Sequence, residues 1–229
     1  MRYRIKLMGP WPFDYSGTMQ PIIVTLDGNI GSGKSTLLAA LAVQLPDVEV
    51  VVEPVAEWMI LKNAEGKSLL ELFYEDKRRW AYTFQNCAIL TRLRTIKEAM
   101  ASTKKRVILT ERSVLTDRYV FAEMLRETGD IDKVEWNLYC QWFDTFASEL
   151  PVAGIVYLTT GVTTSGNRII KRGRAGEEHI PASYLAALED QHKAWLSSTP
   201  LPVLQLSTEE GMSVDDNIAS IKTFISHLL

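Results

Sequence analysis

One short segment constrains the fold of this chain more than any other. The run GNIGSGKS spans Gly28–Ser35 and fits the pattern G-x-x-x-x-G-K-[ST], in which glycines let the backbone N–H groups curl around phosphate oxygens. The apolar run Pro21–Gly28 predicts a buried strand, and the residues from about Gly33 to Leu45 predict a helix. Such a helix directs its positive end at an anion, so the segment predicts a phosphate site.

The loop also predicts separate roles for two side chains that would contact a nucleoside triphosphate. Lys34 is expected to reach the β- and γ-phosphates, and the Ser35 hydroxyl is expected to ligate Mg²⁺. The motif alone leaves kinase, ATPase and GTPase open. The residues expected to bind ATP here are Gly28, Asn29, Ile30, Gly31, Ser32, Gly33, Lys34, Ser35 and Thr36.

The rest of the chain alternates short β-branched runs with longer helical patterns. Five apolar strands separated by helices predict an α/β fold, a five-stranded parallel sheet with helices on both faces. We expect one domain over residues 21–229, preceded by an irregular arm at residues 1–20. The further strands are expected at Val48–Pro54, Arg106–Glu111, Gly154–Thr160 and Pro202–Ser207. The further helices are expected within Lys67–Met100 (the longest part from Glu75), near Ser113–Glu127 and Asp132–Glu149, then before the basic segment RIIKRGRAGEEH, from Pro181 to Leu196, and over Val214–Leu229.

Composition excludes several classes of partner. A net charge of −3 gives no support for an extended nucleic-acid surface, and no run approaches the roughly 18 apolar residues of a membrane span. The two cysteines, Cys87 and Cys140, lie in apolar helical patterns without metal-ligand spacing, which predicts free thiols in a reducing compartment. We therefore expect a cytoplasmic protein. A mitochondrial leader within residues 1–20 is the weaker alternative, because two prolines and an aspartate interrupt any helix there.

Two glutamates follow neighbouring strand patterns. Glu53 ends the second strand and Glu111 ends the third, and ligands of open parallel sheets bind beyond those ends. Phosphoryl transfer to a hydroxyl needs a metal anchor and a group that takes the proton, and these carboxylates can divide the two tasks. Arg112 follows directly and is expected to stabilise charge on the transferring phosphoryl group.

The long helix predicted after Glu75 carries a mixed stripe. Tyr82, Gln85, Ile89 and Arg92 share one face, where an amide and a guanidinium could read the edges of a planar polar ligand. The alternative is an ordinary solvent-exposed face.

A basic cluster lies later in the chain. Arg168, Lys171, Arg172 and Arg174 are expected between two helices, with glycines among them. A charge run is often only a solvated surface. Because this chain has no surplus of cations, we expect a mobile lid at about residues 168–178 that closes over the triphosphate.

Five stretches together resemble the deoxyribonucleoside kinase family, in particular its deoxycytidine and deoxyguanosine kinase branch. These stretches are GNIGSGKST, EPVAEW, YEDKRRWAYTFQ, ERSVLTDRYVFAEML and RIIKRGRAGEEHIP. The resemblance implies a P-loop kinase fold, ATP and Mg²⁺ as cofactors, and transfer of the γ-phosphoryl to the 5′-hydroxyl of a deoxynucleoside in nucleotide salvage. It also implies a homodimer that contacts through helices.

The resemblance further implies residue roles. Glu53 would be the base, Gln85 would pair with the nucleobase, and Tyr74 with Glu177 would hold the 3′-hydroxyl. Lys34, Glu53 and Arg112 would carry catalysis, Ser35 and Glu111 would serve the metal, and Arg168, Arg172 and Arg174 would be lid arginines on ATP. The deoxynucleoside would be bound by Glu53, Trp58, Tyr74, Phe84, Gln85, Ala88, Arg92, Arg112, Asp117, Phe121 and Glu177.

The likeness to the deoxycytidine and deoxyguanosine branch depends on Ala88, Arg92 and Asp117, the last two of which we expect to form a buried ion pair. We therefore expect deoxycytidine and purine deoxynucleosides to be preferred. The alternatives are a thymidine-preferring enzyme and a monophosphate kinase such as thymidylate kinase, the latter suggested by Asp117-Arg118-Tyr119. A GTP-dependent switch would need an NKxD-like guanine reader, which the sequence lacks.

Overall fold

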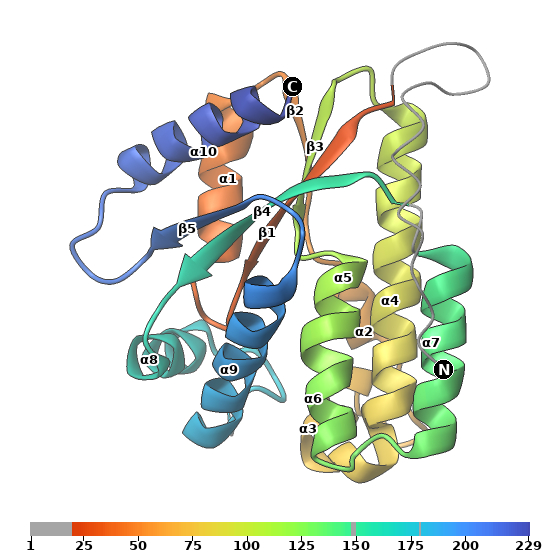
Figure 1. The fold of residues 1–229 in the computed structure, drawn as a ribbon. Helices are drawn as coiled ribbons and strands as arrows, with labels where there is room; N and C mark the ends of the chain where they lie inside the picture. The colour runs from red at the N-terminus through yellow and green to blue at the C-terminus, as the bar shows by residue number, and fades with distance from the viewer. Residues whose placement is uncertain (1–19, 148–149, 179) are drawn as a thin grey trace.

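Five β-branched runs form the parallel sheet that the sequence predicts (Figure 1). The computed structural model describes residues 20–147, 150–178 and 180–229. The strands pair in the order β2-β3-β1-β4-β5, so the P-loop strand β1 lies at the centre, between β3 and β4. Their bounds are β1 Ile22–Gly28, β2 Val48–Val51, β3 Val107–Glu111, β4 Val152–Thr159 and β5 Val203–Ser207.

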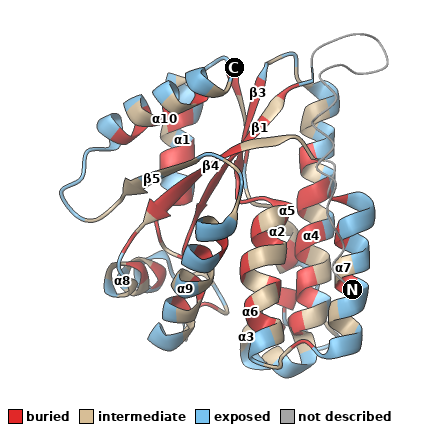
Figure 2. Ribbon diagram, in the orientation of Figure 1, coloured by how far each residue is buried: buried red, intermediate tan, exposed pale blue. Residues whose placement is uncertain are grey.

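Helices cover both faces of the sheet, as Figure 2 shows by the red stripes that they turn inward. On one face, α1 and α10 pack against the sheet around buried residues such as Leu26, Leu38 and Ile221. The other face carries a larger core, which includes Phe73, Tyr139 and Leu188. The helices of the described residues are α1 Lys34–Gln44, α2 Val55–Ile60, α3 Leu69–Glu75, α4 Lys77–Ser102, α5 Val114–Thr116, the π-helical turn η1 Asp117–Phe121, α6 Ala122–Glu127, α7 Lys133–Phe146, α8 Val162–Arg172, α9 Ala182–Ser198 and α10 Val214–Leu228.

Local hydrogen bonds explain where several helices begin. Ser68 accepts from the backbone N–H of Glu71, whose side chain bonds back to Ser68, and this capping box starts α3. Asp76 accepts from the Arg79 N–H and starts α4, so the predicted helical stretch is divided at this aspartate. Asp132 starts α7 in the same way as Ser68 starts α3.

The structure corrects three details of the sequence prediction. Strand β2 ends at Val51, so Glu53 lies in the turn after the strand. Helix α2 at Val55–Ile60 was not predicted, because Pro54 was interpreted only as the end of a strand. Helix α7 ends at Phe146 rather than at Glu149. The arm expected at residues 1–20 lies, apart from Gln20, outside the described residues.

Within the described ranges, every helix is too short or too polar to cross a membrane.

Candidate active site

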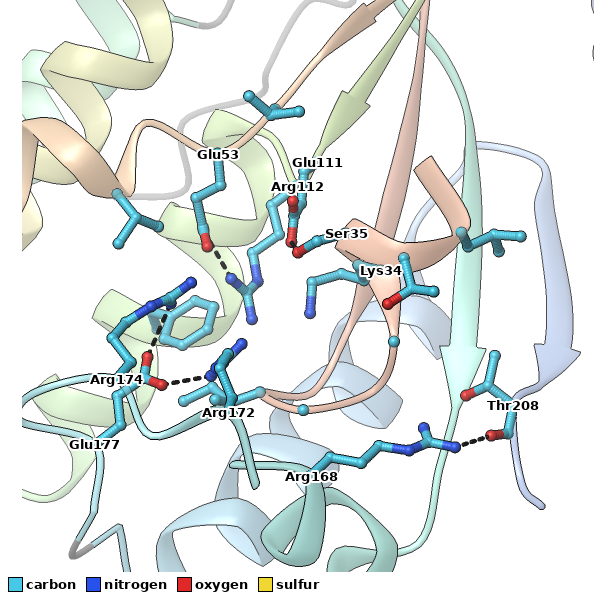
Figure 3. A pocket seen from close by; sticks show the side chains of 18 of the residues that line it. Lys34, Ser35, Glu53, Glu111, Arg112, Arg168, Arg172, Arg174, Glu177 and Thr208 are labelled. Atoms are coloured by element: carbon cyan, nitrogen blue, oxygen red, sulfur yellow. Dashed lines mark hydrogen bonds and ion pairs between the residues drawn. The ribbon is translucent and has the colours of Figure 1, made fainter. Parts of the chain in front are cut away.

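The carboxyl ends of the strands open into one large pocket (Figure 3). Its volume is about 860 Å³, within the range of pockets that bind small molecules. The P-loop lies at one side of the pocket, and helices α3, α4 and η1 line the other. All catalytic and deoxynucleoside-binding residues expected from the sequence line this pocket. These residues therefore lie together in the structure, whereas their roles stay predictions.

Lys34 is buried and folds over the P-loop. Its Nζ donates to the carbonyl oxygens of Asn29 at 2.7 Å and Gly28 at 3.1 Å. Burial, followed by the nearby charge of Arg112, lowers the pKa of Lys34 to about 7, against contributions from acidic neighbours that raise it. An ammonium desolvated in this way would gain strongly from the negative charge of a phosphate.

The tip of the P-loop is closely packed. Gly31 has φ +77°, and a Cβ there would lie 2.4 Å from the carbonyl oxygen of Ser165 in α8. Only glycine allows both this left-handed backbone and this approach. Helix α8 is therefore seated directly on the phosphate loop.

Ser35 and Glu111 lie together at the start of α1 and the end of β3. The Ser35 hydroxyl donates to Glu111 Oε1 at 3.0 Å. A hydroxyl beside a carboxylate is a donor set of hard oxygens, which suits Mg²⁺ with the substrate phosphates as its other ligands. Both residues fit the metal role expected for them.

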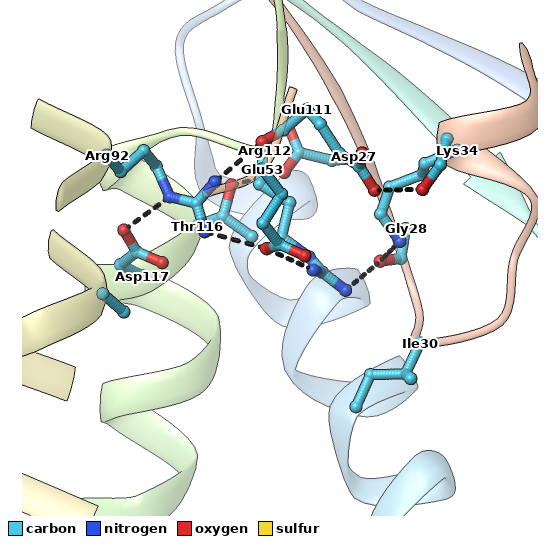
Figure 4. A network of polar contacts seen from close by, with 12 residues as sticks. Asp27, Gly28, Ile30, Lys34, Glu53, Arg92, Glu111, Arg112, Thr116 and Asp117 are labelled. Carbon is cyan, nitrogen blue, oxygen red and sulfur yellow. Dashed lines mark hydrogen bonds and ion pairs between the residues drawn. The ribbon is translucent and has the colours of Figure 1, made fainter. Parts of the chain in front are cut away.

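A buried ionic network surrounds Glu53 (Figure 4). Its Oε1 accepts from Arg112 Nη1 at 2.7 Å and from Arg92 Nη2 at 2.9 Å. Arg92 also donates from Nε to Asp117 Oδ2 at 2.8 Å and from Nη1 to the Glu111 carbonyl oxygen at 2.7 Å. The buried Arg92–Asp117 pair expected from the sequence is thus confirmed, and one guanidinium also joins it to Glu53.

These contacts set the charge of Glu53. Burial alone would raise the pKa of its carboxyl, but the guanidinium charges of Arg112 and Arg92 lower that pKa well below its ordinary value. The same pairing, with Asp117 and Glu53, raises the pKa of Arg92 although burial opposes it. Glu53 is consequently ionised.

Arg112 has an uncommon backbone conformation. Its φ is +59°, and it is the one non-glycine with positive φ in the described part of the chain. A left-handed backbone costs an L-residue roughly 1–2 kcal/mol. Such strain persists where the surrounding contacts determine it, and here it aims the guanidinium at Glu53, 4.9 Å above the Phe121 ring.

Aromatic residues and one amide form the far end of the pocket. Phe84 stacks on Phe73 with centroids 4.6 Å apart and meets Trp58 edge-on at 5.2 Å. Gln85, next to Phe84 on α4, is 1% exposed, and its Oε1 has no hydrogen-bond partner among the described residues. A buried amide oxygen without a partner is costly, so this end is suited to a flat ligand with a polar edge.

Glu177 lies between the basic segment and the rest of the pocket. Its carboxylate accepts from Arg172 Nη2 at 2.5 Å and from Arg174 Nη1 at 3.0 Å. Tyr74 lines the same part of the pocket. Burial, together with the charges of Tyr184 and Glu177, raises the pKa of Tyr74 well above its ordinary value, so its hydroxyl stays protonated.

The structure corrects the placement of the basic cluster. Arg168, Lys171 and Arg172 are not between two helices but in the last two turns of α8, which ends at a left-handed Gly173. Arg168 and Arg172 therefore share one helix face toward the pocket, and Arg168 Nη2 donates to the Thr208 carbonyl oxygen at 2.6 Å (Figure 3). Only the part of the expected lid from Gly173 onward is loop.

Comparison with known proteins identifies the family. The family model for deoxynucleoside kinase matches residues 24–228, which is nearly the whole chain. The chain belongs to the deoxynucleoside kinase family. The resemblance and the P-loop kinase fold inferred from the sequence are thereby confirmed.

Relatives of this deoxynucleoside kinase cover most of its length. It is 36% identical over 218 residues to a probable deoxycytidine kinase of Fowlpox virus (strain NVSL), covering 90% of this chain and 88% of the viral protein. It is 33% identical to human deoxycytidine kinase, over 90% of this chain and 91% of the human one. It is 30% identical to a mitochondrial deoxyguanosine kinase of Xenopus laevis, over 92% of each chain. These relatives are named as nucleoside kinases, which favours neither a monophosphate kinase nor a GTP-dependent switch.

One part of this deoxynucleoside kinase site and one buried carboxylate beside it were missed from the sequence. The segment from Thr208 to Met212 lines the P-loop side of the pocket, and Thr208 Oγ1 donates to the Ser32 carbonyl oxygen at 2.8 Å. It directly follows β5, so the rule that drew attention to Glu53 and Glu111 would have found it. The second is Asp27, a buried carboxylate one residue before the loop, which is hidden in an apolar strand pattern.

Proposed function

We propose that this protein transfers the γ-phosphoryl of ATP to the 5′-hydroxyl of deoxynucleosides, with deoxycytidine and purine deoxynucleosides preferred. The observation that carries the proposal is the buried Gln85 amide, which lies in the same pocket as the P-loop and the ionised Glu53. The P-loop side holds the phosphate donor, and the aromatic end encloses a nucleobase whose edge satisfies Gln85. The acceptor hydroxyl then points toward Glu53.

In the proposed reaction, Glu53 accepts the proton of the 5′-hydroxyl. The 5′ oxygen of the deoxynucleoside bonds to the γ-phosphorus of ATP while the bond between that phosphorus and ADP breaks. Arg112, held 2.7 Å from Glu53, and Lys34 stabilise the charge on the transferring group. Mg²⁺ held by Ser35 and Glu111 would neutralise phosphate charge when bound. Positive charge around the phosphates on the α8 side of the pocket comes from Arg168, Arg172 and Arg174.

Base preference is proposed from the ion pair at the pocket wall. Arg92 and Asp117 are buried beside Ala88, and all three line the pocket. Their charges favour a base with an exocyclic amine, such as cytosine or adenine, and disfavour the apolar C5-methyl group of thymine. Tyr74 and Glu177 are proposed to bind the 3′-hydroxyl of the sugar.

A product assay tests the proposal. The enzyme is incubated with ATP, Mg²⁺ and each of the four deoxynucleosides, and with thymidine monophosphate as a rival acceptor. We expect 5′-monophosphates of deoxycytidine, deoxyadenosine and deoxyguanosine at higher kcat/KM than thymidine monophosphate from thymidine. Phosphorylation of thymidine monophosphate alone would overturn the proposed reaction, and a preference for thymidine would overturn the proposed base selection.

We further propose a homodimer through α7 and the adjoining part of α4. Val134, Leu138, Trp142 and Phe146 are exposed at intervals of four residues along α7, and each is at least 40% exposed. Leu90 is exposed on α4, which lies beside α7 (Figure 1). An exposed apolar stripe of this kind marks a protein–protein interface. Light scattering should give twice the chain mass, and Leu138→Lys should shift it to one chain; a monomeric wild type contradicts the dimer.

The two free cysteines support the expectation of a reducing, cytoplasmic compartment. Burial raises the pKa of both thiols, which makes them poor nucleophiles.

A further inference from the structure

Asp27 is a buried carboxylate that the proposed reaction does not use. It is 0% exposed and lies at the end of β1, one residue before the P-loop. Its two oxygens accept from two hydroxyls: Thr25, two residues earlier on the same strand, and Thr116 in α5. Burial raises the pKa of Asp27, against the opposing effects of the two hydroxyl contacts and of the positive charges of Arg112 and Lys34. A carboxylate buried with this many partners joins elements that need a defined relative position.

The contact with Thr116 extends beyond Asp27. Thr116 Oγ1 also accepts from the backbone N–H of Ser113 at 3.1 Å, which closes the capping box that starts α5. The other end of this segment is held by the Arg112 N–H, which donates to the Leu26 carbonyl oxygen at 3.0 Å. Residues 112–116 are therefore tied to β1 at both ends, through the backbone of Leu26 and the side chain of Asp27.

This segment carries two groups of the active site. Arg112, with its left-handed backbone, begins the segment, and Asp117 follows its last residue. Figure 4 shows Thr116 between the Arg92–Asp117 pair and the Glu53–Arg112 pair. A shift of Thr116 would therefore move Arg112 and Asp117, and with them the ion pair of Arg112 with Glu53 and that of Asp117 with Arg92.

We propose that Asp27 is a positioning residue of the phosphoryl-transfer centre, which acts through Thr116 to hold the Arg112 segment against the P-loop strand. The proposal rests on the role proposed above for Arg112. The two hydroxyl contacts of the Asp27 carboxylate then have different roles. Thr25 satisfies Asp27 within its own strand, whereas Thr116 transmits the position of Asp27 to the active site.

The two threonines provide a matched test in the full-length enzyme. Thr116→Val and Thr25→Val each remove one hydroxyl donor from the same carboxylate and leave a side chain of the same shape. We expect Thr116→Val to lower kcat about 10- to 100-fold, because misplacement of a reacting group by about 1 Å has an effect of that size. KM for deoxycytidine should change less than roughly threefold in either variant, and kcat of Thr25→Val should stay near the wild-type value. Thr116→Ser keeps the hydroxyl and should restore kcat.

Equal losses of kcat in the two valine variants would overturn the proposal, because Asp27 would then be only a satisfied buried group. If Thr116→Val gives no folded protein, Asp27→Ala takes its place, because it removes both oxygens that accept from the two hydroxyls. Wild-type kcat in Asp27→Ala would likewise overturn the proposal.

A double-mutant cycle identifies the route. In an Arg112→Ala background, Thr116→Val should lower kcat no further, because the group it positions is gone. Additive losses would overturn the route through Arg112. The role of Arg112 itself is tested by Arg112→Ala alone, so an undiminished kcat there would refute the proposed reaction scheme rather than the contact between Asp27 and Thr116.

Discussion

Replacing Arg92 by methionine removes the guanidinium that joins three parts of the active site. The side chain is 3% exposed and makes an ion pair with Asp117, an ion pair with Glu53 and a hydrogen bond to the Glu111 carbonyl oxygen. Methionine keeps much of the apolar stem but none of the donors. Asp117 is left buried without its ion-pair partner, and Glu53 retains only Arg112.

The size of the effect follows from the burial of the pair. Removing one partner of a buried ion pair lowers the free energy of unfolding by about 3–5 kcal/mol, because the other charge stays desolvated. Deleting both charges is much less costly, so Arg92→Met with Asp117→Ala should recover a large part of that loss. Arg94→Met, on the same helix, is the matched control: its guanidinium is 56% exposed, and solvent screens its pairs with Glu57 and Glu98, so this substitution should change stability little.

Urea unfolding measures these differences, and steady-state kinetics measures their consequence for substrate choice. The double variant should phosphorylate thymidine more efficiently relative to deoxycytidine, because space and apolar surface replace the two charges beside the base. Its kcat should fall with every substrate, since Arg92 no longer donates to Glu53. The reasoning is refuted if the single variant is no less stable than the double one, or if the ratio of kcat/KM values stays unchanged.

Three further perturbations test separate parts of the site and fold. Glu53→Gln should lower kcat by roughly 10²–10⁴ with little change in deoxynucleoside affinity by calorimetry, because it removes the proton acceptor; near-normal turnover would reject Glu53 as the base. Arg172→Ala should lower kcat more than it weakens deoxynucleoside binding, since its charge meets the transferring group; an effect on binding alone would leave it only as a partner of Glu177. Burial lowers the pKa of His192 from 6.5 to about 3, so the unfolded chain takes up a proton below pH 6.5 before the folded one does, and stability falls as the pH falls. Wild type should therefore lose about 2 kcal/mol between pH 7 and pH 5 that His192→Phe does not lose in urea titrations; parallel pH profiles would contradict this.

Much of the fold was predictable because its determinants are local. Each strand is a short run rich in apolar and β-branched residues, and the loop from Gly28 to Ser35 carries its own conformational requirement in its glycines. The rule that ligands bind beyond the carboxyl ends of parallel strands predicts that Glu53 and Glu111 lie together, and both line the pocket. Helix α2 was missed because a proline can either end a strand or precede the first turn of a helix; β2 already ends at Val51, and Pro54 precedes the first turn of α2.

The sequence by itself determined the family, the parallel sheet and the residue types available for phosphoryl transfer. Only the tertiary structure decided which of those residues form ion pairs and hydrogen bonds with one another. Arg92 contacts Glu53, Asp117 and the backbone of Glu111 because α4 crosses the ends of β2 and β3, and no spacing along the chain encodes that crossing. Likewise, the link from Asp27 to Thr116 spans 89 positions. Ion pairs and buried hydrogen bonds depend on distances of a few ångströms between separate elements, and these are set by how the whole core packs.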